Sequence, residues 1–169
     1  MQDPDTSAPA ATGNPPQKRV ELQKIYVKDI SFEAPGTPEI FTAEWKPEVT
    51  QEMRNAHKQV GDGVFESVLT ITVTVKLAKK VAYLIEVSQA GIFALPGHTQ
   101  EGLEKAFAIF CPTILFPYAR EAISDLSCRG GFPSLVLQNV NFYAMYDEYI
   151  RQKGMADKPD AGQETSIKH

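Results

Sequence analysis

Cysteine and histidine are the residues of this sequence whose side chains could attack a carbonyl group or hold a metal ion. A Cys111–His98 couple would supply a nucleophile and its base. The adjacent Pro112 and the apolar residues around Cys111 favour a packed, reduced thiol instead. We expect both cysteines to be buried and unbridged. The other members of this set are Cys128, His57 and His169.

The spacing of these residues predicts neither a metal site nor a nucleotide site. No histidine has a His or Cys partner at metal-ligand spacing, and there is no Cys-x-x-Cys pair. The chain lacks the Gly-x-x-x-x-Gly-Lys-[Ser/Thr] loop for phosphates and the Gly-x-Ser-x-Gly turn of hydrolases. We expect no cofactor. Dispersed acid–base pairs leave no local motif, so an enzyme remains one reading.

The charge balance bears on possible partners. The sequence contains 17 Lys and Arg residues and 21 Asp and Glu residues, which gives a net charge of -4. No basic run exceeds a pair, which excludes the basic patch of a nucleic-acid binder and favours partners with basic surfaces. Residues 1–19 have no signal-peptide pattern, and no apolar run approaches the roughly 18 residues of a membrane span. We expect a cytosolic protein that does not insert into membranes.

Apolar residues are concentrated in the middle of the chain. Residues 1–19 and 154–169 contain few of them, so neither segment can bury enough surface to offset its ordering entropy. We predict a disordered N-terminal tail over 1–19, one folded domain over 20–153 and a disordered C-terminal tail over 154–169.

The first half of this domain favours strands. Residues 20–33 are rich in strand formers, and their alternation changes phase as it would at a bulge. Residues 39–49 predict a short edge strand, and the polar residues 50–62 predict a loop. The regular alternation over 64–77, followed by a short turn and a second alternating run over 81–88, predicts a hairpin.

The second half favours helices. From Thr99 to Cys128 the pattern is helical, with a restart or kink expected at Pro112 and Pro117. Pro112 could instead lie in the first turn of a second helical stretch, and Gly130 is the expected left-handed cap. A last helix over 141–152 begins at Asn141, a good N-cap. Strands followed by helices predict an α+β fold, with an antiparallel sheet and helices on one face. The region 107–118 is apolar nearly all round, which favours cover by a second subunit.

Several motifs resemble SecB, the family of bacterial protein-export chaperones. The stretch YVKDISFEAP from Tyr26 to Pro35 is similar to the family's first-strand signature. The resemblance covers about residues 22–152. The motifs that follow in the family's order are WKPEV at 45–49, LIEV at 84–87, GIF at 91–93, CPTILFPYARE at 111–121, Arg129-Gly130, Phe132-Pro133 and VNF at 140–142.

The resemblance implies a four-stranded antiparallel sheet with two helices, assembled into a homotetramer as a dimer of dimers. It implies a protein that is not an enzyme and holds unfolded precursor proteins without ATP. It also implies delivery of these precursors to SecA, the ATPase of the Sec translocase. A non-catalytic adaptor or scaffold that binds one folded partner through its acidic sheet face is the alternative.

The resemblance assigns SecA binding to Asp29, Glu33, Leu84 and Glu86. Even spacing places Asp29 and Glu33 on one face of their strand, and likewise Leu84 and Glu86 on theirs. A flat acidic face with one exposed leucine suits a basic partner.

The resemblance assigns subunit contacts to Ile85 and Val87, although the family often has Cys where Ile85 stands. It also implies an apolar client groove between the sheet, the crossover loop and the last helix. Gln51 stands where further apolar residues are common. The candidate client-binding residues are Phe32, Trp45, Val49, Met53, Leu137, Phe142, Met145 and Tyr146.

Overall fold

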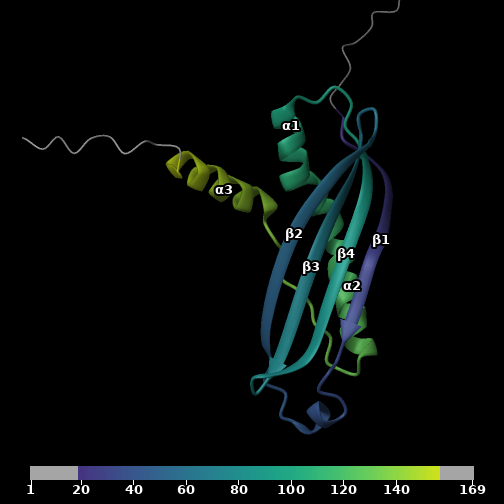
Figure 1. The fold of residues 1–169 in the computed structure, drawn as a ribbon, viewed down its shortest axis with the longest axis vertical. Coiled ribbons are helices and arrows are strands. Elements are labelled where there is room, and N and C mark those ends of the chain that lie inside the picture. The colour runs from purple at the N-terminus through teal and green to yellow at the C-terminus, as the bar shows by residue number, and fades with distance from the viewer. Residues whose placement is uncertain (1–18, 157–169) are drawn as a thin grey trace, which may run out of the picture.

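The computed structural model describes residues 19–156 as an antiparallel sheet with a long helix across one face (Figure 1). The sheet has four strands in the order β1-β4-β3-β2, which confirms the predicted fold class. Both predicted tails lie largely outside the described residues. The strands are β1 (Glu21–Glu33), β2 (Glu48–Gly61), β3 (Val64–Leu77) and β4 (Lys80–Ala94).

The predictions for residues 39–62 are wrong. Residues Glu39–Thr42 form a short 3-10 helix, η1, and the predicted loop lies within the 14-residue strand β2. Strand β2 is an edge strand with solvent on both sides of most of its length, so its polar residues do not alternate with apolar ones. Its conformation is set by pairing with β3, for example Met53 opposite Ile71.

The predicted bulge and hairpin are confirmed. Strand β1 shifts register against β4 between Leu22 and Lys24 and between Val27 and Asp29. Strands β3 and β4 pair along their whole length and are joined through Ala78 and Lys79, whose φ angles of 47° and 68° belong to a tight hairpin turn.

One continuous helical rod follows the sheet. It comprises α1 (Gln100–Lys105), a π-helical turn, η2 (Ala106–Phe110), and α2 (Cys111–Arg129). The rod continues without a break through both prolines. Pro112 lies in the first turn of α2, which confirms the alternative prediction for this residue, and Pro117 lies inside α2. The predicted left-handed cap is displaced by one residue. The backbone of Gly130 has right-handed helical angles, whereas Gly131, with a φ of 83°, takes the left-handed conformation.

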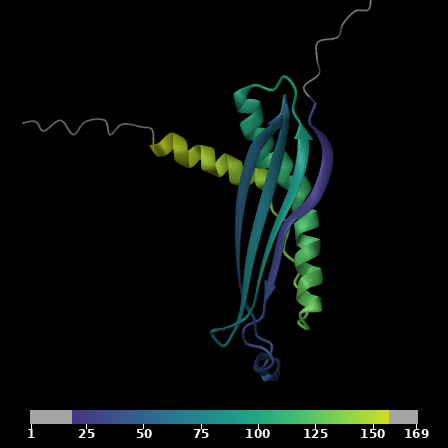
Figure 2. The same ribbon diagram turned by 45° about the vertical axis from the view of Figure 1, so that its right-hand side comes forward.

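The last helix, α3 (Phe142–Ala156), starts as predicted. The amide N of Ala144 donates to Oδ1 of Asn141 at 3.0 Å, which confirms the N-cap. The helix runs to Ala156, so the predicted tail begins inside it. Helix α3 projects beside the β2 edge and contacts η2, whereas α2 lies along the sheet (Figures 1 and 2).

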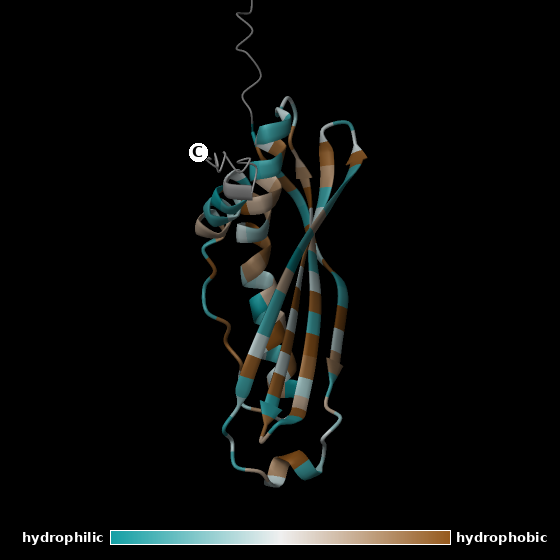
Figure 3. Ribbon diagram, turned by 60° about the vertical axis from the view of Figure 1, so that its left-hand side comes forward, coloured by the Kyte–Doolittle hydropathy of each residue, from teal (hydrophilic) through white to brown (hydrophobic). Residues whose placement is uncertain are grey.

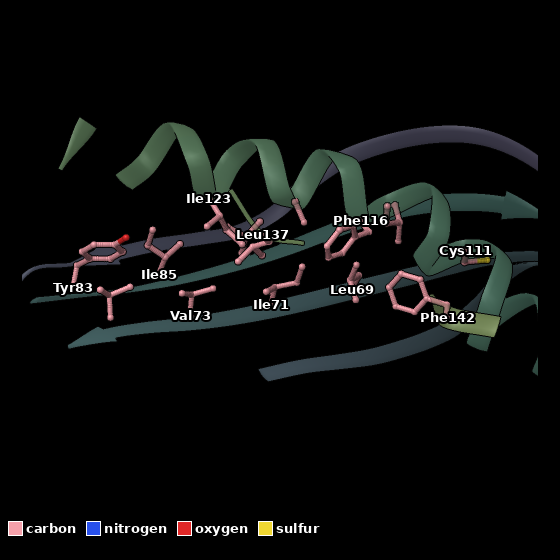
Figure 4. Close-up of a cluster of buried hydrophobic side chains, with 14 of the residues drawn as sticks. Leu69, Ile71, Val73, Tyr83, Ile85, Cys111, Phe116, Ile123, Leu137 and Phe142 are labelled. Atoms are coloured by element: carbon pink, nitrogen blue, oxygen red, sulfur yellow. The ribbon is translucent and has the colours of Figure 1, made fainter. Parts of the chain in front are cut away.

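The core lies between α2 and the sheet face that it covers, which we call the inner face. Along β3 and β4 every second side chain enters this layer, and hydropathy alternates along both strands (Figure 3). Leu69, Ile71 and Val73 of β3 are fully buried there, together with Ile123 of α2 (Figure 4). The opposite, outer face of the sheet has no helix over it within the described part of the chain.

The helical rod Gln100–Arg129 is long and apolar enough, by length and composition alone, to cross a membrane. Its apolar residues have another explanation. Leu115 and Ala119 are fully buried against the sheet, as expected for the core helix of a folded domain.

Candidate functional site

The four residues assigned to SecA binding lie together on the outer face. Glu33 of β1 lies directly opposite Leu84 of β4, and Asp29 lies opposite Ser88. Directly opposed residues point to the same side of a sheet, and Glu86 lies between Leu84 and Ser88 at even spacing. The strand order that makes β1 and β4 neighbours therefore unites two pairs that are far apart in sequence.

The Glu86 carboxylate is held by the two strands on its other side. Oγ1 of Thr72 on β3 donates to Oε2 of Glu86 at 2.7 Å. Nη2 of Arg54 on β2 lies 3.3 Å from the same oxygen. The side chain of Glu86 is 33% exposed and that of Arg54 is 69% exposed, so the ion pair faces solvent.

Glu52 is an outer-face carboxylate that the sequence reasoning missed. It lies opposite Thr72, which in turn lies opposite Glu86, so three strands contribute to one row of side chains. Residues 50–62 lack regular alternation, so no local pattern indicated the face on which Glu52 would lie. The acidic face accordingly extends from β1 to β2.

A second charged cluster on the outer face surrounds Glu66 of β3. Its carboxylate lies 2.8 Å from Nζ of Lys28 and 3.4 Å from Nζ of Lys58, and it accepts a hydrogen bond from the Tyr26 hydroxyl. The hydrogen bonds from Lys28 and Tyr26 lower the pKa of Glu66 from 4.5 to about 2. The side chain of Glu66 is only 7% exposed, whereas Lys28 and Lys58 are 42% and 64% exposed. The cluster therefore ties β1, β3 and β2 together around one shielded carboxylate.

The predicted client residues do not form a single pocket. Phe32 and Trp45 belong to an aromatic cluster around Phe132, at ring-centroid distances of 6.5 and 5.9 Å. Phe41 lies 5.0 Å from the same ring. Trp45 and Phe41 remain partly exposed and line a shallow depression with Pro133.

Four of the other predicted residues line a cavity between β2, η2 and α3. The cavity has a volume of about 420 Å³. Its wall includes His57, whose ring stacks on Phe107 at a centroid distance of 3.9 Å. Sequence reasoning missed both of these residues, because each lies in a segment with no binding pattern. The predicted members are Met53, Phe142, Met145 and Tyr146.

Two predicted client residues lie in neither site. Val49 is partly exposed on β2 and lies opposite Val75. Leu137 is buried in the core in the segment before α3 (Figure 4). The two apolar sites therefore lie at different positions on the subunit, one beside η1 and one beside α3.

The two predicted subunit-contact residues occupy the core. The side chains of Ile85 and Val87 are both fully buried in the layer beneath α2. On β1, however, Ile30 lies directly opposite Val87 and is exposed, as is Val27. The exposed apolar side chains next to this pair therefore belong to β1.

The thiol and imidazole groups do not form a catalytic couple. Burial raises the pKa of the Cys111 thiol to about 12, so it is protonated and packed. Nδ1 of His98 lies 3.3 Å from the Pro96 carbonyl oxygen. Cys128 is free but exposed, so its predicted burial is wrong. Within residues 19–156, no group of three His, Cys, Asp or Glu residues could hold a metal ion.

Comparisons with known proteins agree with this arrangement. Residues 13–153 match the family model described as preprotein translocase subunit SecB. A protein-export protein SecB from Hahella chejuensis is 48% identical over 82% of this chain and 87% of its own length. The SecB protein from Methylococcus capsulatus is 43% identical over 85% of this chain and 93% of its own.

A solved structure shows the same fold. The SecB-like chaperone of Mycobacterium tuberculosis, in complex with an antitoxin peptide, superimposes with a TM-score of 0.60 at 18% identity. The match covers 73% of this chain and 91% of that protein. Together with the matched sequence over the sheet and the helices, these findings show that the chain belongs to the SecB family of protein-export chaperones.

Proposed function

We propose that this protein docks SecA on the acidic outer face, holds unfolded precursors on its two apolar sites and works as a homotetramer. Family membership makes it a cytosolic, non-enzymatic export chaperone. The observation that carries the docking proposal is the convergence of Asp29, Glu33, Leu84 and Glu86 on one exposed sheet face.

The outer face has the chemistry of a docking surface for a basic protein. Its carboxylates are spread over neighbouring strands, and Leu84 adds an apolar contact between them. Complementary charge speeds the encounter and orients the partner, while an apolar side chain at the centre of the contact contributes affinity.

The two apolar sites have the composition that promiscuous binding needs. The cavity beside α3 presents Met53, Met145 and Tyr146, and the depression beside η1 presents Phe41 and Trp45. Methionine and aromatic side chains adapt to many apolar partners. Arg54 lines the cavity beside α3 and also reaches Glu86, but none of the four residues assigned to SecA lines either apolar site, so a client and SecA could bind to one subunit together.

The exposed apolar residues support assembly of several subunits. Phe110 and Tyr118 on the helical rod are 40% and 49% exposed. Val27 and Ile30 on the β1 edge are 49% and 44% exposed. Apolar side chains gathered on two surfaces are typical of subunit interfaces, and two different surfaces suit a dimer of dimers.

Native mass spectrometry tests the assembly. We expect a species of four times 18.7 kDa, which gains mass when a denatured precursor is added. A monomer at micromolar concentration would contradict the proposal.

A second experiment separates the chaperone from the adaptor alternative. We expect the protein to suppress aggregation of several unrelated denatured proteins in the absence of nucleotide, with the native forms of the same proteins unbound. Binding of SecA without any such suppression would favour an adaptor that recognises one folded partner.

A further inference from the structure

The acidic outer face contains its own counter-charge. Arg54 is the positive side chain that reaches Glu86, with Nη2 3.3 Å from Oε2. Oγ1 of Thr72 donates a hydrogen bond to the same oxygen, so both described contacts of this carboxylate are made by Oε2. A basic partner that uses Glu86 must either displace Arg54 or bind beside it.

The position of Arg54 makes this contact specific to Glu86. Strand order places β2 two strands away from β4, and the side chain of Arg54 crosses β3 to reach the carboxylate. Two other outer-face cations, Lys28 and Lys58, are engaged with Glu66. Arg54 is therefore placed to tune the SecA contact independently of the Glu66 cluster.

The energetics allow an effect that can be measured. An exposed ion pair contributes little to stability, so Arg54 does not anchor the fold. It also cancels one unit of charge next to a carboxylate that would otherwise attract a basic partner. Arg54 weakens docking in two ways, because a basic partner must break the ion pair and meets a neutralised carboxylate. Both effects end when Arg54 is removed.

We propose that Arg54 lowers the affinity of the acidic face for SecA by neutralising Glu86. This inference rests on the proposed docking function. The Arg54 guanidinium reduces the negative potential that Glu86 presents to a basic partner. The affinity for SecA is therefore lower than it would be with the outer-face carboxylates and no Arg54.

A double-mutant cycle with full-length SecA tests the inference. The four proteins are the unchanged chain, Arg54→Ala, Glu86→Gln and the double variant, titrated by calorimetry at low and high salt. We expect Arg54→Ala to bind SecA about 3-fold more tightly at low salt, as the magnitude of exposed pairs suggests. This gain should vanish in the Glu86→Gln background and fall at high salt.

Lys76→Ala is the matched control, because it removes one positive charge from the outer end of β3 without contact to Glu86. An equal gain from Lys76→Ala, or a gain from Arg54→Ala that persists in the Glu86→Gln background, would overturn the role of Arg54. If Glu86→Gln itself leaves SecA binding unchanged, the docking face is wrong and the inference falls with it. Circular dichroism and thermal melts establish that each variant is folded.

Discussion

Glu33 of β1 lies directly opposite Leu84 of β4, so an acidic and an apolar side chain from distant parts of the sequence form one contact surface. This pairing depends on the bulge between Val27 and Asp29. If Lys28 instead paired with Ser88 in a regular ladder, every later side chain of β1 would exchange faces. The bulge therefore brings both Asp29 and Glu33 to the same face as Leu84.

Reversing one charge on this face should separate the two binding functions. Glu86→Lys is expected to weaken SecA binding at least about tenfold, since it replaces attraction by repulsion towards a basic surface. Suppression of client aggregation should persist, because both apolar sites lie elsewhere. Calorimetry with SecA and a light-scattering assay with a denatured client measure the two activities.

Glu21→Lys is the control for this variant, since it makes the same charge change at the far end of β1. It should leave SecA binding within about twofold of the unchanged chain, because its exposed site is more than a Debye length away. Equal loss of SecA binding and client holding in Glu86→Lys would contradict the assignment.

A charge placed in the cavity beside α3 should impair client holding. Met145 lines the cavity and is partly exposed, so Met145→Glu is expected to fold while opposing burial of apolar client segments. We expect client affinity to fall about 5- to 10-fold with SecA binding retained. Val136→Glu, at an exposed site away from the cavity, is the control. Equal effects of the two variants would argue against the cavity.

The Glu66 cluster should appear as a pH-dependent contribution to stability. The folded-state pKa of Glu66 is lowered from 4.5 to about 2, so its ionised form favours folding. The contribution is complete above pH 4.5 and is lost as the pH falls towards 2. Glu66→Gln, which breaks the ion pairs with Lys28 and Lys58, should cost about 2 kcal/mol near neutral pH.

Urea unfolding of both proteins at equal protomer concentration measures this difference. The gap in unfolding free energy between the unchanged chain and Glu66→Gln should narrow steadily from about pH 5 to about pH 2. A gap that stays constant over this range would show that the carboxylate charge is not what stabilises the cluster.

Gly130 is required by a close approach of Phe32. A Cβ atom at position 130 would clash with Cζ of Phe32, whose ring packs 5.9 Å from that of Tyr83. Gly130→Ala should therefore destabilise the protein by about 1–3 kcal/mol through overpacking, since its own backbone angles suit alanine. Thermal and urea unfolding provide the measurement.

A compensating change tests this cause. Adding Phe32→Leu should make Gly130→Ala cost less than it does in the unchanged background. Gly61→Ala is the control, because its Cβ would meet Val64 at an ordinary 3.5 Å. An undiminished cost of Gly130→Ala in the Phe32→Leu background would mean that the contact with Phe32 is not responsible.

Local pattern was enough for several elements of this protein. The alternation over β3 and β4 predicted the central hairpin and its two faces, since one side packs on a helix and the other meets water. The Asn141 cap and the apolar spacing after it predicted α3. The order of family motifs predicted the fold and the export function.

Only the tertiary structure determined β2, because an exposed edge strand needs no alternation and takes its conformation from pairing with β3. The same pairing placed Glu52 on the acidic face, joined Arg54 to Glu86 and enclosed Glu66 between two lysines. It also divided the client residues between two sites. Local sequence determines which way a side chain points from its own strand, whereas the neighbours it meets depend on long-range pairing.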